Sequence, residues 1–174
     1  MKVILAVVTS IDGRTTYGNE PGSNWASVED QAKFHTLLAQ SKVVVMGSNT
    51  YREIKSRQKL SPTTLRIIMT HEPEVFNGDV VPGQREFTSE SPKELVARLD
   101  SQGYKELLLV SGEKLSFAFL AEHLVDELWV TVEPILFGAG NGITTEPPQA
   151  VKLELQSSEK LNDKGTLLLK YRIF

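Results

Sequence analysis

The sequence predicts an α/β protein of one domain, 1–174, with a mixed, mostly parallel sheet between layers of helices and an antiparallel strand near the C-terminus. Short apolar runs alternate with amphipathic runs as far as about residue 123, which is typical of strands joined by helices. The early apolar runs are almost continuous, as in parallel strands that helices cover on both faces. After residue 123, strand-like runs follow one another, which favours antiparallel pairing there.

Each expected element has its own local signal. The expected strands are short aliphatic and β-branched runs bounded by turn residues, at 2–9, 42–46, 65–69, 106–110, 127–137, 151–156 and 166–173. The expected helices have apolar residues at helical spacing, at 28–40, 50–56, 91–102 and 114–123. The third helix opens on Ser91, Pro92 and Glu94, which supply a cap, a first-turn proline and an early acid. Between the last two strands, LNDKGT predicts the turn of a hairpin.

The composition argues against several kinds of partner. With 19 basic and 22 acidic side chains the net charge is -3, and no long run of one sign marks a surface for nucleic acid or an anionic membrane. The longest apolar runs are far shorter than the ~20 residues of a membrane span. The chain has no cysteine, and His35, His71 and His123 lie far apart, so we expect no metal and a cytoplasmic setting.

Two junctions between a strand and a helix are candidates for phosphate binding. In VVVMGSNTY the apolar run ends at 47–50, and in LLLVSGEKL the next such junction covers 111–115. Each could be an ordinary turn, or its unpaired N–H groups and helix dipole could receive a phosphate. On neighbouring parallel strands, the two would place a pyrophosphate between two helix dipoles. The residues concerned are Gly47, Ser48, Asn49, Thr50, Ser111, Gly112, Glu113, Lys114 and Leu115.

Two further segments are open to a structural and a functional interpretation. Thr70 and His71 follow the strand at 65–69, with Arg66 inside it, and could hold the 2′-phosphate that distinguishes NADP from NAD. A hydrated turn is the alternative. The glycine-rich FGAGNG at 137–142 is either a plain loop or a place where the backbone approaches a ligand closely.

Asp30, in NWASVEDQAKFHTLL, is the candidate catalytic residue. It lies three residues after Ser27, so it could be no more than the acid of an N-terminal capping box. It also follows Trp25 by five residues and precedes Phe34 by four, and Phe34 shares its helix face. A carboxyl group enclosed by aromatic rings can bind a protonated or amidine-like heterocycle, and burial would shift its pKa. Spacing alone leaves both interpretations open.

Together these segments resemble the dihydrofolate reductase superfamily and, within it, the reductase domain of riboflavin biosynthesis called the RibD C-terminal domain. The resemblance extends over nearly the whole chain. TSIDGRTT at 9–16 is similar to the family's S-L-D-G-x-I, VVVMGSNTY to its M-G-R-x-T followed by an aromatic residue, and LLLVSGEKL to its G-G-x-x-L cofactor turn. LVDELWVTVEPILFGAGNGI is similar to the element L-V-D-E-L…P-V-L-L-G-x-G-x-P-L-F, the motif most specific for the riboflavin branch.

The resemblance implies a dihydrofolate-reductase-like fold and hydride transfer from NADPH, with 47–50, 70–71 and 111–115 at the cofactor. The implied substrate is 5-amino-6-(5-phosphoribosylamino)uracil or its 2,5-diamino pyrimidinone analogue, and a homodimer is a further expectation. Asp30 would orient and polarise the heterocycle or its sugar. The implied substrate contacts are Asp12, Gly13, Arg14, Trp25 and Phe34.

The sequence departs from the family pattern at several positions. Ser48 replaces the usual arginine and Ser111 the first glycine of the second turn, which could weaken or shift the grip on phosphate. Thr63, Thr64 and Leu65 stand where a folate reductase has the arginine for its glutamate tail, which counts against dihydrofolate.

Two alternatives stay open at the level of sequence. One is a dihydrofolate or pterin reductase, and the other is a non-catalytic nucleotide-binding module of the same fold. For a sugar phosphate, the nearby cations are Arg14, Lys33, His35 and Arg52. Of these we favour Arg14, because it follows Asp12 and Gly13 at the end of the first strand.

Overall fold

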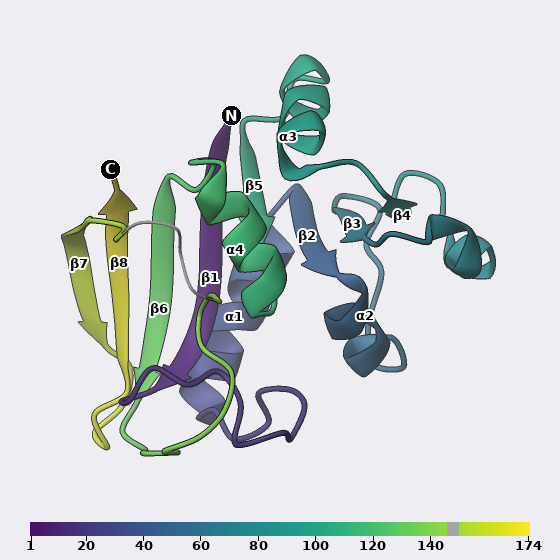
Figure 1. Cartoon of the computed structure of the whole chain (residues 1–174). Coiled ribbons are helices and arrows are strands. Elements are labelled where there is room, and N and C mark those ends of the chain that lie inside the picture. The colour runs from purple at the N-terminus through teal and green to yellow at the C-terminus, as the bar shows by residue number, and fades with distance from the viewer. Residues whose placement is uncertain (146–149) are drawn as a thin grey trace.

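The computed structural model describes residues 1–145 and 150–174, and its strands form a single mixed sheet (Figure 1). The strands are β1 (Lys2–Ser10), β2 (Val43–Gly47), β3 (Leu65–Met69), β4 (Arg85–Thr88), β5 (Glu106–Leu109), β6 (Glu127–Glu133), β7 (Leu153–Lys160) and β8 (Leu167–Ile173). Their order is β4-β3-β2-β5-β1-β6-β8-β7. Pairs from β4 to β6 are parallel, and β8 is antiparallel to both its neighbours. The expected fold class is confirmed.

Helices cover both faces of this sheet. The helical elements are α1 (Val28–Gln40), α2 (Ser48–Ile54), the 3-10 helix η1 (Pro73–Asp79), α3 (Pro92–Ser101) and α4 (Glu113–Ala121). One apolar cluster packs α3 and α4 on Val45 and Ile67, and a second packs α1, α2 and η1 on Val44 and Ile68. Because successive strand residues point to opposite faces, the clusters lie on the two sides of the same strands. In Figure 1, α4 lies in front of the sheet and α1 behind it.

The central parallel strands are buried on both faces. Val43, Val44 and Val45 of β2 are fully buried, as are Leu107 and Leu109 of β5. This explains why these strands are apolar at every position, where a half-exposed strand would alternate. Each side chain of this size contributes about 1.5–3 kcal/mol by leaving water.

Two elements were not expected, β4 and η1. The four residues of β4 are only partly buried and include Arg85 and Glu86, so an edge strand of this length carries no apolar signal. The helix expected at 50–56 begins earlier, at Ser48, directly after its N-cap Gly47.

Two strands have other bounds than expected. The strand expected at 127–137 ends at Glu133, because Pro134 follows and has no N–H for the sheet. The strand expected at 151–156 is Leu153–Lys160, an edge strand whose residues are all exposed. Such a strand has no buried face, and its second half, SSEK, has no apolar residue that would mark it as a strand.

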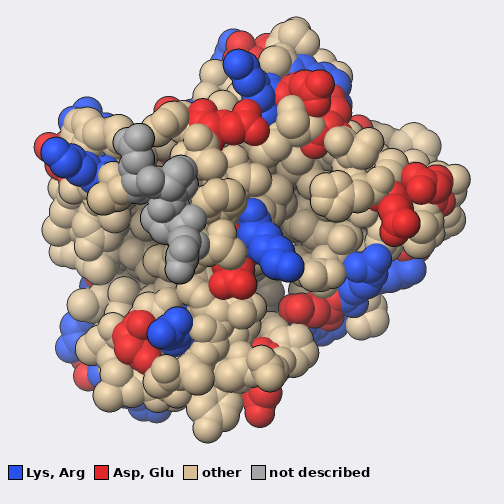
Figure 2. All heavy atoms as spheres, in the orientation of Figure 1, with Lys and Arg blue, Asp and Glu red and all other residues tan. Residues whose placement is uncertain are grey.

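The surface carries no large patch of one charge on the face drawn in Figure 2, where acidic and basic side chains are interspersed. In the described ranges, no helix combines the length and the apolar character that crossing a membrane requires. The same ranges contain no group of three or more His, Cys, Asp or Glu side chains that could hold a metal ion.

Candidate active site

A cleft opens where the carboxyl ends of β2 and β5 lie side by side. Val44 and Val45 pair with Leu108 and Leu109, and beyond them α2 leaves toward one face of the sheet and α4 toward the other. Such a divergence is the topological switch point at which open α/β sheets bind ligands. The cleft has a volume of about 2320 Å³ and is lined by α1, α2 and α4, so it offers room for more than one small molecule.

The two helices that begin at the switch point have no side-chain cap. Gly47 is the N-cap of α2 and Gly112 the N-cap of α4, and neither offers a side-chain oxygen to the first turn. A Cβ atom on Gly47 would lie 3.8 Å from Cδ2 of Leu115, so Leu115, in the first turn of α4, lies beside the start of α2. The hydroxyl of Ser111 lies 3.0 Å from that of Ser116 instead of at the helix start. The arrangement leaves two neighbouring helix starts whose first N–H groups have no side-chain cap.

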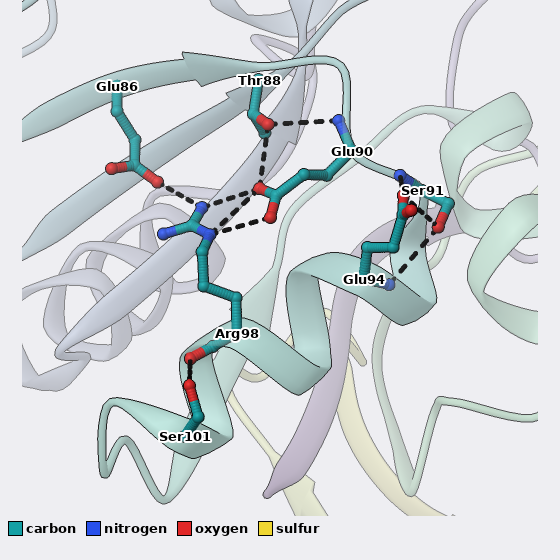
Figure 3. A network of polar contacts seen from close by, with 7 residues as sticks. All are labelled: Glu86, Thr88, Glu90, Ser91, Glu94, Arg98 and Ser101. Carbon is teal, nitrogen blue, oxygen red and sulfur yellow. Dashed lines mark hydrogen bonds and ion pairs between the residues drawn. The ribbon is translucent and has the colours of Figure 1, made fainter.

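By contrast, α1 and α3 begin with serine caps. At α3 the Oγ of Ser91 accepts the N–H of Glu94 at 3.3 Å, and the Glu94 carboxylate accepts the N–H of Ser91 at 2.8 Å, which completes a capping box (Figure 3). At α1 the Oγ of Ser27 accepts the N–H of Asp30 at 3.2 Å. Here, however, the N–H of Ser27 donates to Oε1 of Glu133 on β6, at 2.8 Å. Glu133 thus takes the place that a capping box would give to the Asp30 carboxyl group.

The carboxyl group of Asp30 lines the cleft. Asp30 is 7% exposed, and Thr131 on β6 lies beside its carboxyl group. Burial raises the pKa of Asp30 above its ordinary 3.8; the adjacent Thr131 hydroxyl opposes this rise, and the nearby Glu133 carboxylate adds to it. Phe34, one turn further along α1, lines the cleft with it. The site therefore contains a carboxyl group that keeps its proton to higher pH than a free aspartate.

Glu133 is held in turn by the segment that joins β7 to β8. Its Oε2 accepts the hydroxyl proton of Thr166 at 2.6 Å. Asn162 donates to Oγ1 of Thr166 at 2.9 Å and to the carboxylate of Glu29 at 3.1 Å, and this second bond is the main cause that lowers the pKa of Glu29. The C-terminal hairpin thereby fixes the start of α1, and with it the position of Asp30.

Asp12 connects the loop after β1 to the glycine-rich segment. Its carboxylate accepts the Ser10 hydroxyl at 2.6 Å and the N–H groups of Phe137 and Gly138 at 3.1 and 2.8 Å. These bonds, led by that from Ser10, lower the pKa of Asp12 to about 2. Both oxygens of Asp12 are thus occupied by the protein itself.

Gly140 allows the closest approach between these two loops. Its φ is 140°, and a Cβ atom there would overlap the carbonyl oxygen of Thr16. Nη1 of Arg14 donates to the carbonyl of Gly140 at 3.2 Å. Glu113, in the first turn of α4, accepts the N–H of Gly142 at 3.2 Å. The glycine-rich segment therefore bridges the β1 loop and the start of α4.

Trp25 belongs to an aromatic cluster in these loops. Its ring packs edge-to-face on Phe137 with centroids 4.8 Å apart, and Tyr17 packs on the same ring at 5.2 Å. The cluster stabilises the loops beside the cleft, whereas Asp30 and Phe34 line the cleft itself. Four of the expected substrate residues belong to these loops and do not line the cleft, namely Asp12, Gly13, Arg14 and Trp25.

Thr70 and His71 line the cleft at the end of β3. The Oγ1 of Thr70 accepts the N–H of Glu72 at 3.3 Å, which is the bond of a tight turn. Arg66 lies four residues earlier, about 13 Å back along the strand, and shares with Ile68 the face toward α1 and α2. The structure separates Arg66 from the other two residues of this set.

The cleft brings together most of the side chains selected from the sequence. They are Asp30, Phe34, Gly47, Ser48, Asn49, Thr50, Thr70, His71, Ser111, Gly112, Glu113, Lys114 and Leu115. Thr131 and Glu133 were not selected from the sequence. They occupy every second position after Trp129 on β6 and therefore share its face of the strand. The polar alternation in WVTVE is the signal that could have identified them.

The sheet order and the cleft at its switch point define a dihydrofolate-reductase-like α/β protein. The family model for the RibD C-terminal domain matches residues 1–167, and the chain belongs to this family. It is 24% identical over 165 residues to protein YwjB of Bacillus subtilis (strain 168), with 91% of each chain covered.

Two further proteins cover nearly all of the chain. The 2,5-diamino-6-ribosylamino-4(3H)-pyrimidinone 5′-phosphate reductase of Methanothermobacter thermautotrophicus is 24% identical, over 98% of this chain and 97% of its own. The solved structure of Acinetobacter baumannii RibD (form 2) matches with a TM-score of 0.79 and 21% identity, over 99% of this chain and 58% of that chain. The structural match shows the shared fold.

Proposed function

We propose that this protein is an NADPH-dependent reductase that transfers a hydride to a pyrimidine ribosyl phosphate. The observation that carries the proposal is the pair of uncapped helix starts, 47–50 and 111–115, which meet at the switch point. Membership of the RibD C-terminal domain family supports a reductase. The name of the archaeal relative supports the substrate class.

The residues at the two helix starts fit a dinucleotide. Their N–H groups and helix dipoles suit a pyrophosphate, and the side chains of Thr70 and His71, which line the same cleft, are the proposed contacts of a 2′-phosphate. When bound there, NADPH supplies the hydride of the reduction. The part of the chain itself is to align the two reactants and to keep water out of the cleft.

Asp30 is proposed as the acid of the reaction. Reduction of a C=N or C=O bond adds a hydride to carbon and a proton to nitrogen or oxygen, so a proton donor must lie beside the acceptor. The raised pKa of Asp30 suits this role, because its carboxyl group holds a proton that an exposed aspartate would lose. The Thr131 hydroxyl beside the carboxyl group opposes part of this rise in pKa.

A second candidate is the reduction of dihydrofolate or a pterin. A buried carboxyl group such as Asp30 can hold an amidine-like ring through paired hydrogen bonds, and this observation favours the second candidate as well.

Oxidation of NADPH by the purified protein, followed with each acceptor in turn, tests the proposal. We expect turnover with the pyrimidine ribosyl phosphate and none with dihydrofolate. Efficient reduction of dihydrofolate alone would select the second candidate. Calorimetry provides the cofactor test, since absence of binding at millimolar NADPH would refute the reductase proposal. Equal affinity for NADPH and NADH would mean that Thr70 and His71 only form a turn and do not contact the 2′-phosphate.

A further inference from the structure

Arg66 carries a charge that its surroundings do not neutralise. Its Nη1 is buried and has no hydrogen-bond partner among the described residues. Burial and the nearby Arg85, its register partner on β4, both lower the pKa of Arg66. A guanidinium group has five N–H donors and no acceptor, and an unpaired buried donor of this kind is costly. An arginine left in this state at the wall of a cleft is suited to receive an anion.

Gln58 offers a second donor at the same place. Its Oε1 accepts a hydrogen bond from Nη1 of Arg85 at 3.4 Å, which leaves the amide nitrogen turned away from Arg85. That nitrogen is buried and has no acceptor in the part of the chain that is described. Arg85 is itself fixed, because its Nε donates to the carbonyl of Asp79 and its guanidinium lies 5.4 Å from the ring centre of Tyr51. We call Gln58, Arg66 and Arg85 the Arg66 subsite.

The Arg66 subsite lies at the opposite end of α1 from Asp30. Oγ1 of Thr64 donates to the carbonyl of Ser41 at 2.9 Å, which fixes the start of β3 against the end of α1. Asp30 is in the first turn of α1, and Leu38, near its end, lines the same cleft as Arg66 and Gln58. The eight residues from Asp30 to Leu38 span about 12 Å. One elongated molecule can therefore reach both ends.

Three of the four cations considered first for a sugar phosphate have other partners. Lys33 forms an ion pair with Glu159 at 2.8 Å. Arg52 donates to Oδ1 of Asn49 at 3.1 Å, and Arg14 donates to a carbonyl of the glycine-rich segment. Lys33 and Arg52 would have to exchange these bonds before they could serve a ligand, whereas the buried Nη1 of Arg66 has none to exchange among the described residues. Arg14 also has a buried nitrogen, Nε, with no partner among the described residues, but it lies outside the cleft that Arg66 lines.

We propose that the Arg66 subsite binds the phosphate monoester of the substrate while Asp30 meets the other end of the same molecule. This inference rests on the proposed function, since it assigns the anionic end of that substrate. A phosphate presents three oxygens, and an arginine fork with a neighbouring amide donor matches them. A carboxylate tail would use the same donors, so the test compares both anions.

The test uses thermal stability of the whole chain without NADPH, so it does not depend on turnover. Ribose 5-phosphate, ribose and p-aminobenzoylglutamate are each titrated into the wild type, Arg66→Met, Gln58→Leu and Arg57→Met. Arg57 is the matched control, because it is an exposed arginine on the rim of the same cleft that bonds to Asn24. We expect ribose 5-phosphate, and not ribose, to raise the Tm of the wild type and of Arg57→Met.

In Arg66→Met we expect the apparent affinity for ribose 5-phosphate to fall at least tenfold, and in Gln58→Leu severalfold. Without any anion, Arg66→Met should melt no lower than the wild type, because it removes a guanidinium nitrogen that is buried without a partner among the described residues. Equal protection of Arg66→Met and wild type would overturn the proposal, as would an equal loss in Arg57→Met. Protection by p-aminobenzoylglutamate alone would overturn the assignment to phosphate. Failure of NADPH oxidation, by comparison, would refute the proposed function and not this subsite.

Discussion

The four α-helices in the described part of the chain begin in two different ways. α1 and α3 start on Ser27 and Ser91, whose side chains accept a first-turn N–H, whereas α2 and α4 start on Gly47 and Gly112 and have no side-chain cap. A serine cap contributes typically about 1 kcal/mol relative to alanine, and glycine gives up only a few tenths of this. The two uncapped starts are those that meet at the β2–β5 junction. Where the chain omits the cap, it leaves the helix dipole open to a ligand.

The largest expected effect comes from placing a negative charge at an uncapped start. Gly112 has a φ of -72°, and no atom lies within 4 Å of the position that a Cβ would take, so Gly112→Asp fits the backbone. A carboxylate about 4 Å from a phosphate costs about 4 kcal/mol at an effective dielectric constant of 20. We expect NADPH affinity to fall at least a hundredfold, as measured by calorimetry.

The neutral isostere Gly112→Asn is the control for this prediction. It can cap the helix without adding charge, so it should lose no more than severalfold in NADPH affinity and should keep or raise the Tm. If Asp and Asn weaken binding equally, the helix start does not face a phosphate.

The next largest effect concerns Glu133, which accepts the N–H of Ser27 at the start of α1. Glu133→Ala leaves the N–H of Ser27 and the hydroxyl of Thr166 without their acceptor, and an unsatisfied buried group costs about 1–3 kcal/mol. We expect urea unfolding to show a loss of this size. Glu94→Ala, which removes an exposed acceptor at α3, should cost less, because water can replace it. Equal losses would mean that the two helix starts are energetically alike.

Asp30→Asn tests whether the Asp30 carboxyl group, which forms no capping box, takes part in the reaction. We expect turnover to fall at least tenfold, about 1.4 kcal/mol of transition-state stabilisation, with nearly unchanged NADPH affinity. A variant that keeps full activity and only loses helix stability would show that Asp30 acts as a helix-start acid.

The pH dependence of Asp30 follows from its raised pKa. Folding favours the protonated form, so its contribution to stability is fully present below the unfolded pKa, near 3.8, and is lost as pH rises through the folded value. If Asp30 is the acid, turnover should fall over the same rise in pH. Tm and turnover are measured across pH for the wild type and Asp30→Asn. Both the loss of stability and the fall in turnover with rising pH should appear in the wild type only.

The smallest effect is expected at a capped start away from the β2–β5 junction. Ser91→Ala removes the acceptor for the N–H of Glu94 and should cost about 1 kcal/mol in the free energy of unfolding. NADPH affinity should not change. If Ser91→Ala also weakened NADPH binding, cofactor binding would not be specific to the uncapped helix starts.

Much of the fold could be predicted because burial leaves a mark on the sequence. The strands β2 and β3 are buried enough to be apolar almost throughout, and α1 was expected with the bounds that it has. β4 and β7 lie at the two edges of the sheet, where few side chains need to be apolar, so one was missed and the other shifted.

The site was harder to predict, because its partners are distant along the chain. The uncapped starts are local features and could be selected from single segments. The release of Asp30 from its capping role depends on Glu133, 106 residues after Ser27. Arg66 could be noticed as a cation in a strand, but the unpaired state of its buried nitrogen depends on how β3, β4 and Gln58 pack together in the described part of the chain.

The bond from Thr166 to Glu133 also determines when the site can form. Thr166 lies 33 residues after Glu133, which lies 106 residues after Ser27, so the acceptor that α1 needs is secured only after residue 166 has been synthesised. The uncapped helix starts, by contrast, are complete once β5 and α4 have been synthesised. During translation, the half of the cleft at these helix starts can therefore take shape before the half that contains Asp30.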